Sequence, residues 1–298
     1  MTYSLVARDP ETGDLGVAVQ SHFFSVGSVV SWAEPGVGAV ATQSFAETTY
    51  GARGLELMRA GRSAAGALGE LVDQDESEAV RQVAMIDSAG RVAVHTGHGC
   101  IPEAAHQVGN QMSAQANMMR NSTVPDAMVK AFASAEAELA WRLLAALDAA
   151  EAEGGDVRGR QSAALLVVSG KRTDTPWKER PVDLRVEDHP DPLVELRRLL
   201  RLRKAYDLVE EAEVAAVNGD MEASARHYEL AHEIVPDNVE IAFWYGLALA
   251  GAGRVEEGRQ LVHRAVAAND GWAELLKRLP QTGLMPDDPD LLRALLDE

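Results

Sequence analysis

The sequence predicts an α+β protein in which two layers of sheet carry helices on their outer faces, followed by an all-helical domain. Two groups of strand patterns are separated by a helical stretch, and a further helix and one returning strand follow them, which indicates the layered part. No strand pattern occurs beyond Leu193, which indicates the helical part. We therefore predict two domains, at residues 1–192 and 193–298.

Short β-prone runs bounded by turn residues recur through the first domain. The predicted strands are residues 4–8, 15–19, 28–32, 38–43, 83–86, 91–95, 112–118 and 162–168. The first two form a hairpin, because Pro10 and Gly13 between them supply turn geometry. A second turn is expected at Glu34-Pro35-Gly36.

Helical periodicity appears in two stretches of the same domain. Residues 50–72 suit one helix or two, with a break at Ala60-Gly61. Residues 125–152 predict one long helix, since Pro125 suits a first turn and Gly154-Gly155 stops it. The proline-rich, charged residues 171–192 predict an irregular segment, which is either an arm packed on the sheets through Trp177 or an exposed linker.

The second domain carries an internal repeat of 34 residues. At that offset Ala212 matches Gly246, Gly219 matches Gly253, Tyr228 matches Val262 and Ala231 matches Ala265. These small, turn-glycine, large and small positions resemble a tetratricopeptide repeat. A tail helix is expected to begin with Asp288 as N-cap and Pro289 in the first turn.

Composition disfavours several classes of function. The net charge of −18 opposes binding to nucleic acid or to an anionic membrane surface. The single cysteine, Cys100, excludes a disulfide within the chain and a paired-thiol metal site, and we expect neither metal nor cofactor. No leader-like segment and no membrane-spanning run is present, so a cytoplasmic location is the simplest expectation.

Thr2 is the first candidate for chemistry. Removal of Met1, which a small second residue permits, would leave a hydroxyl and a free α-amine on one residue. Such an amine, with a pKa near 8, is a general base beside its own nucleophile. The alternative is that Thr2 is only a common second residue. Ser4 is a second candidate nucleophile on the same strand, although its amine lies in a peptide bond.

Several motifs resemble a bacterial domain-of-unknown-function family, family ten-twenty-eight, over roughly residues 2–200. The matching segments are residues 2–13 (TYSLVARDPETG), 16–19 (GVAV), 23–30 (FFSVGSVV), 36–43 (GVGAVATQ), 114–119 (AQANMM), 154–167 (GGDVRGRQSAALLV) and 188–192 (DHPDP). The resemblance implies a four-layer α/β/β/α sandwich of the N-terminal-nucleophile (Ntn) hydrolases, a proteasome-like fold. Members of that class mostly cleave amide bonds.

The resemblance also implies roles for particular residues. Thr2 would be the nucleophile, and backbone amides near Thr42 and Gln43 would stabilise the oxyanion. Ser21 would take the place of the proteasome's aspartate, and Asn117 and Asp156 would lie near the same edge. The chain departs from the proteasome pattern because it has no lysine before Lys130.

Two functions therefore stay open. The first is an Ntn-type hydrolase that cleaves an amide or related acyl bond in a small molecule. A second copy of the chain is a further candidate partner. The second is a non-catalytic protein of the same fold, which acts as a binding or assembly module through its helical repeats. A retained Met1 would remove the base that the first function needs.

Overall fold

The structure is a computed structural model that describes residues 2–296. Its strands are β1 (Thr2–Arg8), β2 (Leu15–Ser21), β3 (Ser31–Glu34), β4 (Gly38–Ser44), β5 (Arg81–Asp87), β6 (Val92–Thr96), β7 (Ala105–Gly109), β8 (Met112–Asn117), β9 (Ser162–Val168) and β10 (Val182–Val186). The α-helices are α1 (Gly27–Val30), α2 (Thr49–Arg59), α3 (Ala64–Gln74), α4 (Val124–Ser134), α5 (Leu139–Ala152), α6 (Pro192–Val217), α7 (Met221–Ile234), α8 (Val239–Gly251), α9 (Val255–Ala268), α10 (Gly271–Arg278) and α11 (Pro289–Leu296).

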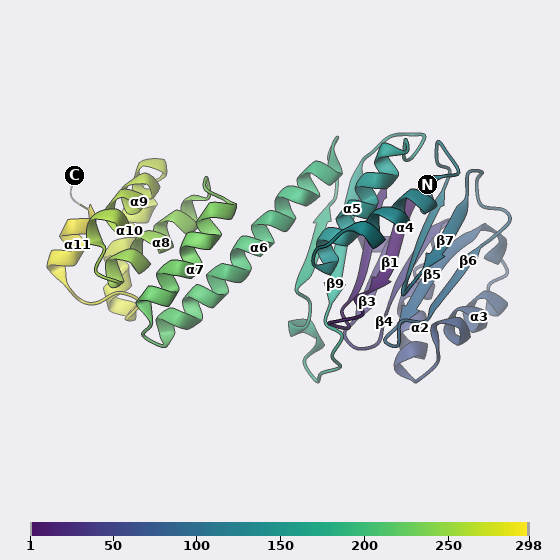
Figure 1. The fold of residues 1–298 in the computed structure, drawn as a ribbon, viewed down its shortest axis with the longest axis horizontal. Helices are drawn as coiled ribbons and strands as arrows, with labels where there is room; N and C mark the ends of the chain where they lie inside the picture. The colour runs from purple at the N-terminus through teal and green to yellow at the C-terminus, as the bar shows by residue number, and fades with distance from the viewer. Residues whose placement is uncertain (1, 297–298) are drawn as a thin grey trace. The chain divides into compact units, whose positions relative to one another are not determined.

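The strands form two antiparallel sheets. The larger sheet has the order β10-β9-β2-β1-β8-β7, so β1 and β2 lie in its interior. The smaller sheet has the order β3-β4-β5-β6. The predicted hairpin is confirmed, since β1 pairs with β2, and the strands predicted at residues 83–86 and 91–95 pair with each other as β5 and β6. The fold is therefore of the mixed α+β class, with a helical region after the sheets (Figure 1).

Three apolar clusters show how helices and sheets pack in this part of the chain. One cluster joins α4 and α5 to the larger sheet, and includes Tyr3, Leu5, Leu143 and Leu147. A second joins α2 and α3 to the smaller sheet. The third lies between the two sheets, where Val17 and Val19 meet residues of β4 and β5. Since side chains alternate along a strand, each sheet buries both of its faces.

The single long helix predicted for residues 125–152 is wrong. The structure has α4 and α5 instead, because the backbone becomes extended at Ala135. The Arg142 guanidinium of α5 lies over the Phe132 ring of α4, at 4.2 Å from the ring centroid. This cation–π contact stabilises the packing of the two helices. No glycine or proline marks the break in the sequence. Packing of both helices on one sheet decides it, not local propensity.

Other expectations also need correction. Residues 28–30, expected in a strand, belong to the short helix α1, and only the following residues form β3. The arm at residues 171–192 contains an unexpected edge strand, β10, which pairs with β9. Trp177 does not anchor the arm, since 69% of its surface is exposed. Strand β7 was not predicted either, and its exposed face explains its weak apolar pattern.

The chain divides into two compact units, Met1–Leu200 and Arg201–Glu298, with the division inside α6. Within the second unit the matched small and large positions are buried, among them Ala212, Tyr228, Val262 and Ala265, whereas the turn glycines Gly219 and Gly253 are exposed. The tail helix begins as expected, since the Asp288 carboxylate accepts hydrogen bonds from the N–H groups of Asp290 and Leu291. These residues therefore serve packing and capping within the unit.

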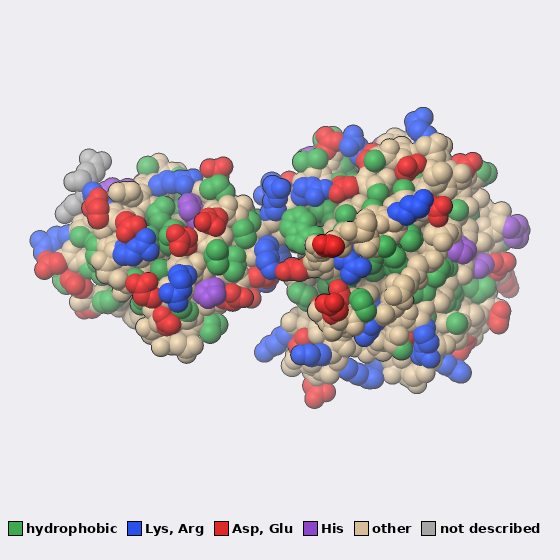
Figure 2. Space-filling model, in the orientation of Figure 1, with side chains coloured by type: hydrophobic (Ala, Val, Ile, Leu, Met, Phe, Trp, Pro, Cys, Tyr) green, Lys and Arg blue, Asp and Glu red, His purple; other side chains and the backbone are tan. Residues whose placement is uncertain are grey.

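The aromatic run Phe243-Trp244-Tyr245 is not an outward contact surface. Phe243 and Tyr245 are buried among the helices of their own unit, and Phe243 also packs against Trp272 with 4.8 Å between ring centroids. Within residues 2–296, no helix is long and apolar enough to cross a bilayer. On the face that Figure 2 shows, acidic and basic side chains are interspersed, and no single-sign patch dominates it.

Candidate functional site

Strands of both sheets end at one edge of the first unit, and Thr2 lies there. In the larger sheet Thr2 pairs with Asn117 at the end of β8, and Tyr3 pairs with Gln20 at the end of β2. In the smaller sheet Gln43, near the end of β4, pairs with Gln82 of β5. The Gln43 side chain reaches across to the backbone carbonyl of Thr2, at 3.2 Å. The two sheets are therefore joined at this edge by polar groups.

Thr2 is the first residue of β1, and only 5% of its surface is exposed. Its hydroxyl donates a hydrogen bond to the hydroxyl of buried Ser21, with 3.1 Å between the oxygens. Two of the predicted site residues are thus in direct contact. The expectation that Met1 is removed falls outside the described residues.

Gln43 is the centre of a buried polar network. Its Oε1 accepts a hydrogen bond from the Ser4 hydroxyl at 2.6 Å. Its Nε2 lies 2.7 Å from Gln82 Oε1 and 3.2 Å from each of the backbone carbonyls of Thr2 and Gln115. One amide thereby links three strands, β1, β5 and β8. A satisfied network of this kind fixes the backbone of its members.

Gln82 of β5 extends the network to the end of β8. Its Oε1 also accepts a hydrogen bond from Asn117 Nδ2 at 2.9 Å, and its Nε2 donates to the backbone carbonyl of Ala116 at 3.0 Å. Gln115 Nε2 donates to the Ser4 hydroxyl at 2.6 Å. All these side chains are neutral amides or hydroxyls. The network that holds Thr2 therefore contains, among these described residues, only uncharged side chains.

Thr42 does not join this network through its side chain. Its hydroxyl donates instead to the backbone carbonyl of Glu47, at 3.1 Å. Successive side chains of a strand point to opposite faces, so the side chains of Thr42 and Gln43 diverge. Of this predicted pair, only Gln43 has its side chain in the space between the sheets.

Asp156 is buried near the same edge but is bound to other partners. Its carboxylate accepts hydrogen bonds from the backbone N–H groups of Arg158, at 2.9 Å, and His22, at 3.2 Å. The Arg158 guanidinium lies 3.1 Å from it. Since His22 directly follows Ser21, Asp156 holds the loop after β2 in place. Its role in the structure is to position a loop.

Ser4, Gln82 and Gln115 belong to the site but were not predicted as part of its polar framework. A signal for them does exist in the sequence. Along β8 the polar residues Ser113, Gln115 and Asn117 alternate with Met112, Ala114 and Ala116, although every one of the six is buried. A buried strand with one polar face indicates a hydrogen-bonded network against a second layer.

Exposed apolar side chains surround the Thr2 edge. Phe23 and Phe24 follow the end of β2, and Phe45 follows the end of β4. Phe24 exposes 64% of its surface. Val157 is also exposed, and its N–H bonds the carbonyl of Met118, just beyond β8. Each of these exposed apolar side chains thus follows, or is bonded next to, the end of a strand at the Thr2 edge.

Tyr3 occupies the opposite face of β1, toward the helices. Its hydroxyl donates to Glu151 of α5, at 2.8 Å, and also contacts Gln20. Burial raises the pKa of Tyr3 well above its usual range, and the nearby Glu151 carboxylate raises that pKa further. Tyr3 therefore stays protonated and fixes the strand that begins with Thr2.

Replacement of Tyr3 by phenylalanine is expected to reduce the loss of stability at alkaline pH. The unfolded chain ionises this tyrosine above about pH 10, whereas the folded chain does not. Its contribution is thus complete below pH ~10 and is lost as pH rises toward the folded pKa. Urea unfolding gives the free energy of unfolding at each pH. Between about pH 10 and pH 11 this free energy should fall by roughly 1 kcal/mol less in Tyr3→Phe than in the wild type. Equal losses would contradict this assignment.

Comparison with known proteins places the first unit in a family. Residues 2–196 match the profile of a family described as "Family of unknown function (DUF1028)", which is more than half of the chain. The chain belongs to this family. No curated protein matches it at a significant level.

A crystal structure of a DUF1028 protein from Silicibacter pomeroyi is similar to this chain. The two are 32% identical, and the match covers 67% of this chain and 88% of the other, with a TM-score of 0.61. The predicted resemblance to family ten-twenty-eight is therefore confirmed. The DUF1028 match ends near the division between the two units, so the helices of the second unit lie outside it.

Proposed function

We propose that this DUF1028 protein is an Ntn-type hydrolase that cleaves an amide or related acyl bond in a small molecule, with Thr2 as nucleophile. The observation that carries the proposal is the position of Thr2. It begins an interior strand at the edge where both sheets end, and its hydroxyl lies 3.1 Å from the Ser21 hydroxyl. Gln43 holds its backbone carbonyl from the opposite sheet.

The arrangement of the sheets supports the same proposal. Two antiparallel sheets face each other, with α2 and α3 on one and α4 and α5 on the other. A pair of helices outside each sheet is what the proposed Ntn-hydrolase fold would require, which supports the proposal. In such a sandwich a chain-terminal nucleophile is held rigidly by its strand, which favours attack in one geometry.

The proposed reaction uses the hydroxyl and the α-amine of Thr2 after removal of Met1. The Thr2 Oγ attacks the substrate carbonyl while its proton passes to the α-amine. The amine then returns this proton to the leaving nitrogen as the C–N bond breaks, and an acyl ester remains on Thr2. Water adds to the ester, loses a proton to the α-amine, and releases the acid as the Thr2 hydroxyl is restored.

The surroundings of Thr2 favour an uncharged, apolar substrate group. The network behind Thr2 contains only neutral side chains, and Phe23, Phe24 and Phe45 border the edge. An alkyl or aryl acyl group would be desolvated by these rings on binding. Without a lysine among the residues preceding Lys130, the α-amine is expected to act as base with a pKa near 8.

A mass measurement tests the proposal directly. The full chain, expressed in cells with normal N-terminal processing, should lack Met1. Incubation with an aryl-substituted β-lactone should then add one equivalent, because the strained ring acylates a nucleophilic hydroxyl without a leaving group. Peptide mapping should locate the adduct on Thr2. A retained Met1, or an adduct on Ser4 or elsewhere, would contradict the proposal.

The second candidate is a non-catalytic DUF1028 protein that works through its helical unit. The absence of any charged side chain from the described part of the Thr2 network favours it, because no cation there would activate the nucleophile. In this case α6 to α9 would form two tetratricopeptide-like pairs that bind a partner or a second copy of the chain. Correct processing of Met1 with no lactone adduct would support this candidate.

A further inference from the structure

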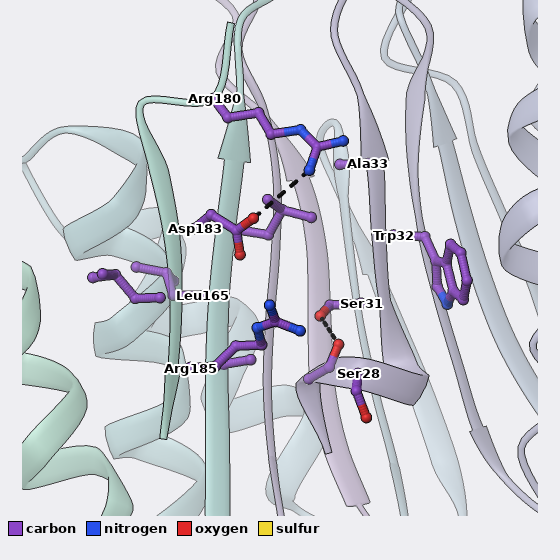
Figure 3. Close-up of a pocket in the computed structure, with 12 residues that line it drawn as sticks. Ser28, Ser31, Trp32, Ala33, Leu165, Arg180, Asp183 and Arg185 are labelled. Carbon is purple, nitrogen blue, oxygen red and sulfur yellow. Dashed lines mark hydrogen bonds and ion pairs between the residues drawn. The ribbon is translucent and has the colours of Figure 1, made fainter. Parts of the chain in front are cut away.

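A polar cavity lies toward the other side of the larger sheet, against its edge strand β10. It has a volume of about 240 Å³, and β10, β9, α1 and β3 line it. Figure 3 shows Arg180, Asp183 and Arg185 reaching from the β10 segment toward Ser31 and Ala33, with Leu165 turned away. Charged groups of both signs therefore converge on one small space.

The register of the edge strand explains this convergence. Asp183 pairs with Leu166, and Arg185 pairs with Ala164. Both β9 residues belong to the apolar cluster between the sheets, so their partners on β10 share that inward face. The smaller sheet ends at β3 and does not cover them. The edge strand β10 thus carries charged side chains on its inward face, next to the apolar residues Ala164 and Leu166 of β9.

These charges are only loosely paired with one another. Arg180 lies 3.7 Å from Asp183, and Arg185 lies 3.9 Å from Glu187. Within residues 2–296, neither guanidinium donates a hydrogen bond to a side chain or backbone group. A guanidinium offers five N–H donors in a planar fork that matches a carboxylate. The cavity therefore has donor capacity that the protein itself leaves unused.

We propose that this cavity binds a free α-amino acid with an aliphatic side chain. Arg185 pairs with the carboxylate of the ligand, Asp183 accepts hydrogen bonds from its ammonium group, and the side chain lies on Ala164 and Leu166. A zwitterion suits the site better than a dianion, because the cavity holds charges of both signs. Its volume equals roughly eight water molecules, which is the size of a small amino acid.

This site is separate from Thr2. Strands β2 and β9 lie between β1 and β10. Three strand spacings of about 4.8 Å each put the two sites ~14 Å apart across the sheet. None of the residues that line the cavity belongs to the Thr2 network. Binding should therefore persist in Thr2→Ala, and the inference does not depend on the proposed hydrolase activity.

Calorimetric titration of the full chain tests the inference, with L-leucine as the probe at concentrations up to about 10 mM. We expect saturable binding of one equivalent. Isocaproate lacks the ammonium group and isoamylamine lacks the carboxylate, so each should bind at least about tenfold more weakly than leucine. Arg185→Met and Asp183→Asn should each raise the Kd for leucine by about tenfold or more.

Two further variants separate loss of the site from loss of the fold. Arg185→Lys keeps a positive charge and should bind leucine with an intermediate Kd. Arg53→Met removes an exposed arginine that pairs with Glu56 on α2, away from the residues that line the cavity, and it should bind like the wild type. The inference is overturned if leucine does not bind, if isocaproate binds as well as leucine, or if Arg185→Met behaves like Arg53→Met.

Discussion

Replacing Thr2 by alanine is expected to lower the rate of lactone acylation, and of any amide hydrolysis, on the order of 10⁵-fold. Loss of a nucleophile removes the covalent route altogether and leaves only binding and orientation. Thermal stability should change little, because the Thr2 side chain contributes one hydrogen bond, to Ser21, worth about 1 kcal/mol. Intact mass spectrometry against time gives the rate, and thermal unfolding gives the stability.

Two variants make this result specific. Thr2→Ser keeps both the hydroxyl and the α-amine and should retain part of the rate. Thr12→Ala removes an exposed threonine in the turn between β1 and β2, at the opposite end of the hairpin, and should label like the wild type. Labelling of Thr2→Ala within a few-fold of the wild type would move the nucleophile elsewhere, with Ser4 the next residue to test.

Replacing Gln43 by leucine is expected to give the largest loss of stability, about 3–5 kcal/mol. Leucine has a similar size but removes the acceptor of the Ser4 hydroxyl proton, one of the two donors to Gln82 Oε1, and the side-chain donor to the Thr2 carbonyl, all in a buried space. Each unsatisfied buried group costs about 1–3 kcal/mol. Urea unfolding at neutral pH measures the difference in the free energy of unfolding.

Gln107→Leu is the matched control for this substitution. Gln107 is an exposed residue of the edge strand β7, so its replacement should change the free energy of unfolding by no more than about 0.5 kcal/mol. A loss below about 1 kcal/mol in Gln43→Leu would mean that the network is not a unit and does not hold Thr2 in place.

The sequence alone predicted the strands and helices whose patterns are local. The hairpin of β1 and β2 follows from Pro10 and Gly13 in its turn, and the break between α2 and α3 follows from Gly61. Buried apolar runs such as β9 were recognised for the same reason. The edge strands β7 and β10 were missed, because an edge strand with an exposed or charged face lacks the apolar pattern of an interior one.

For the candidate site, the sequence indicated which residues are candidates for chemistry, and the tertiary structure decided which of them meet. The resemblance to DUF1028 pointed to Thr2, Ser21 and Gln43, and the structure places these together. Only the tertiary structure shows that Thr42 turns away, that Asp156 is bound by Arg158, and that Gln82 and Gln115 complete the network. The physical reason is that these contacts join strands far apart in the chain. Their geometry depends on the register of each sheet and on how the two sheets face each other, and neither is encoded in a local pattern.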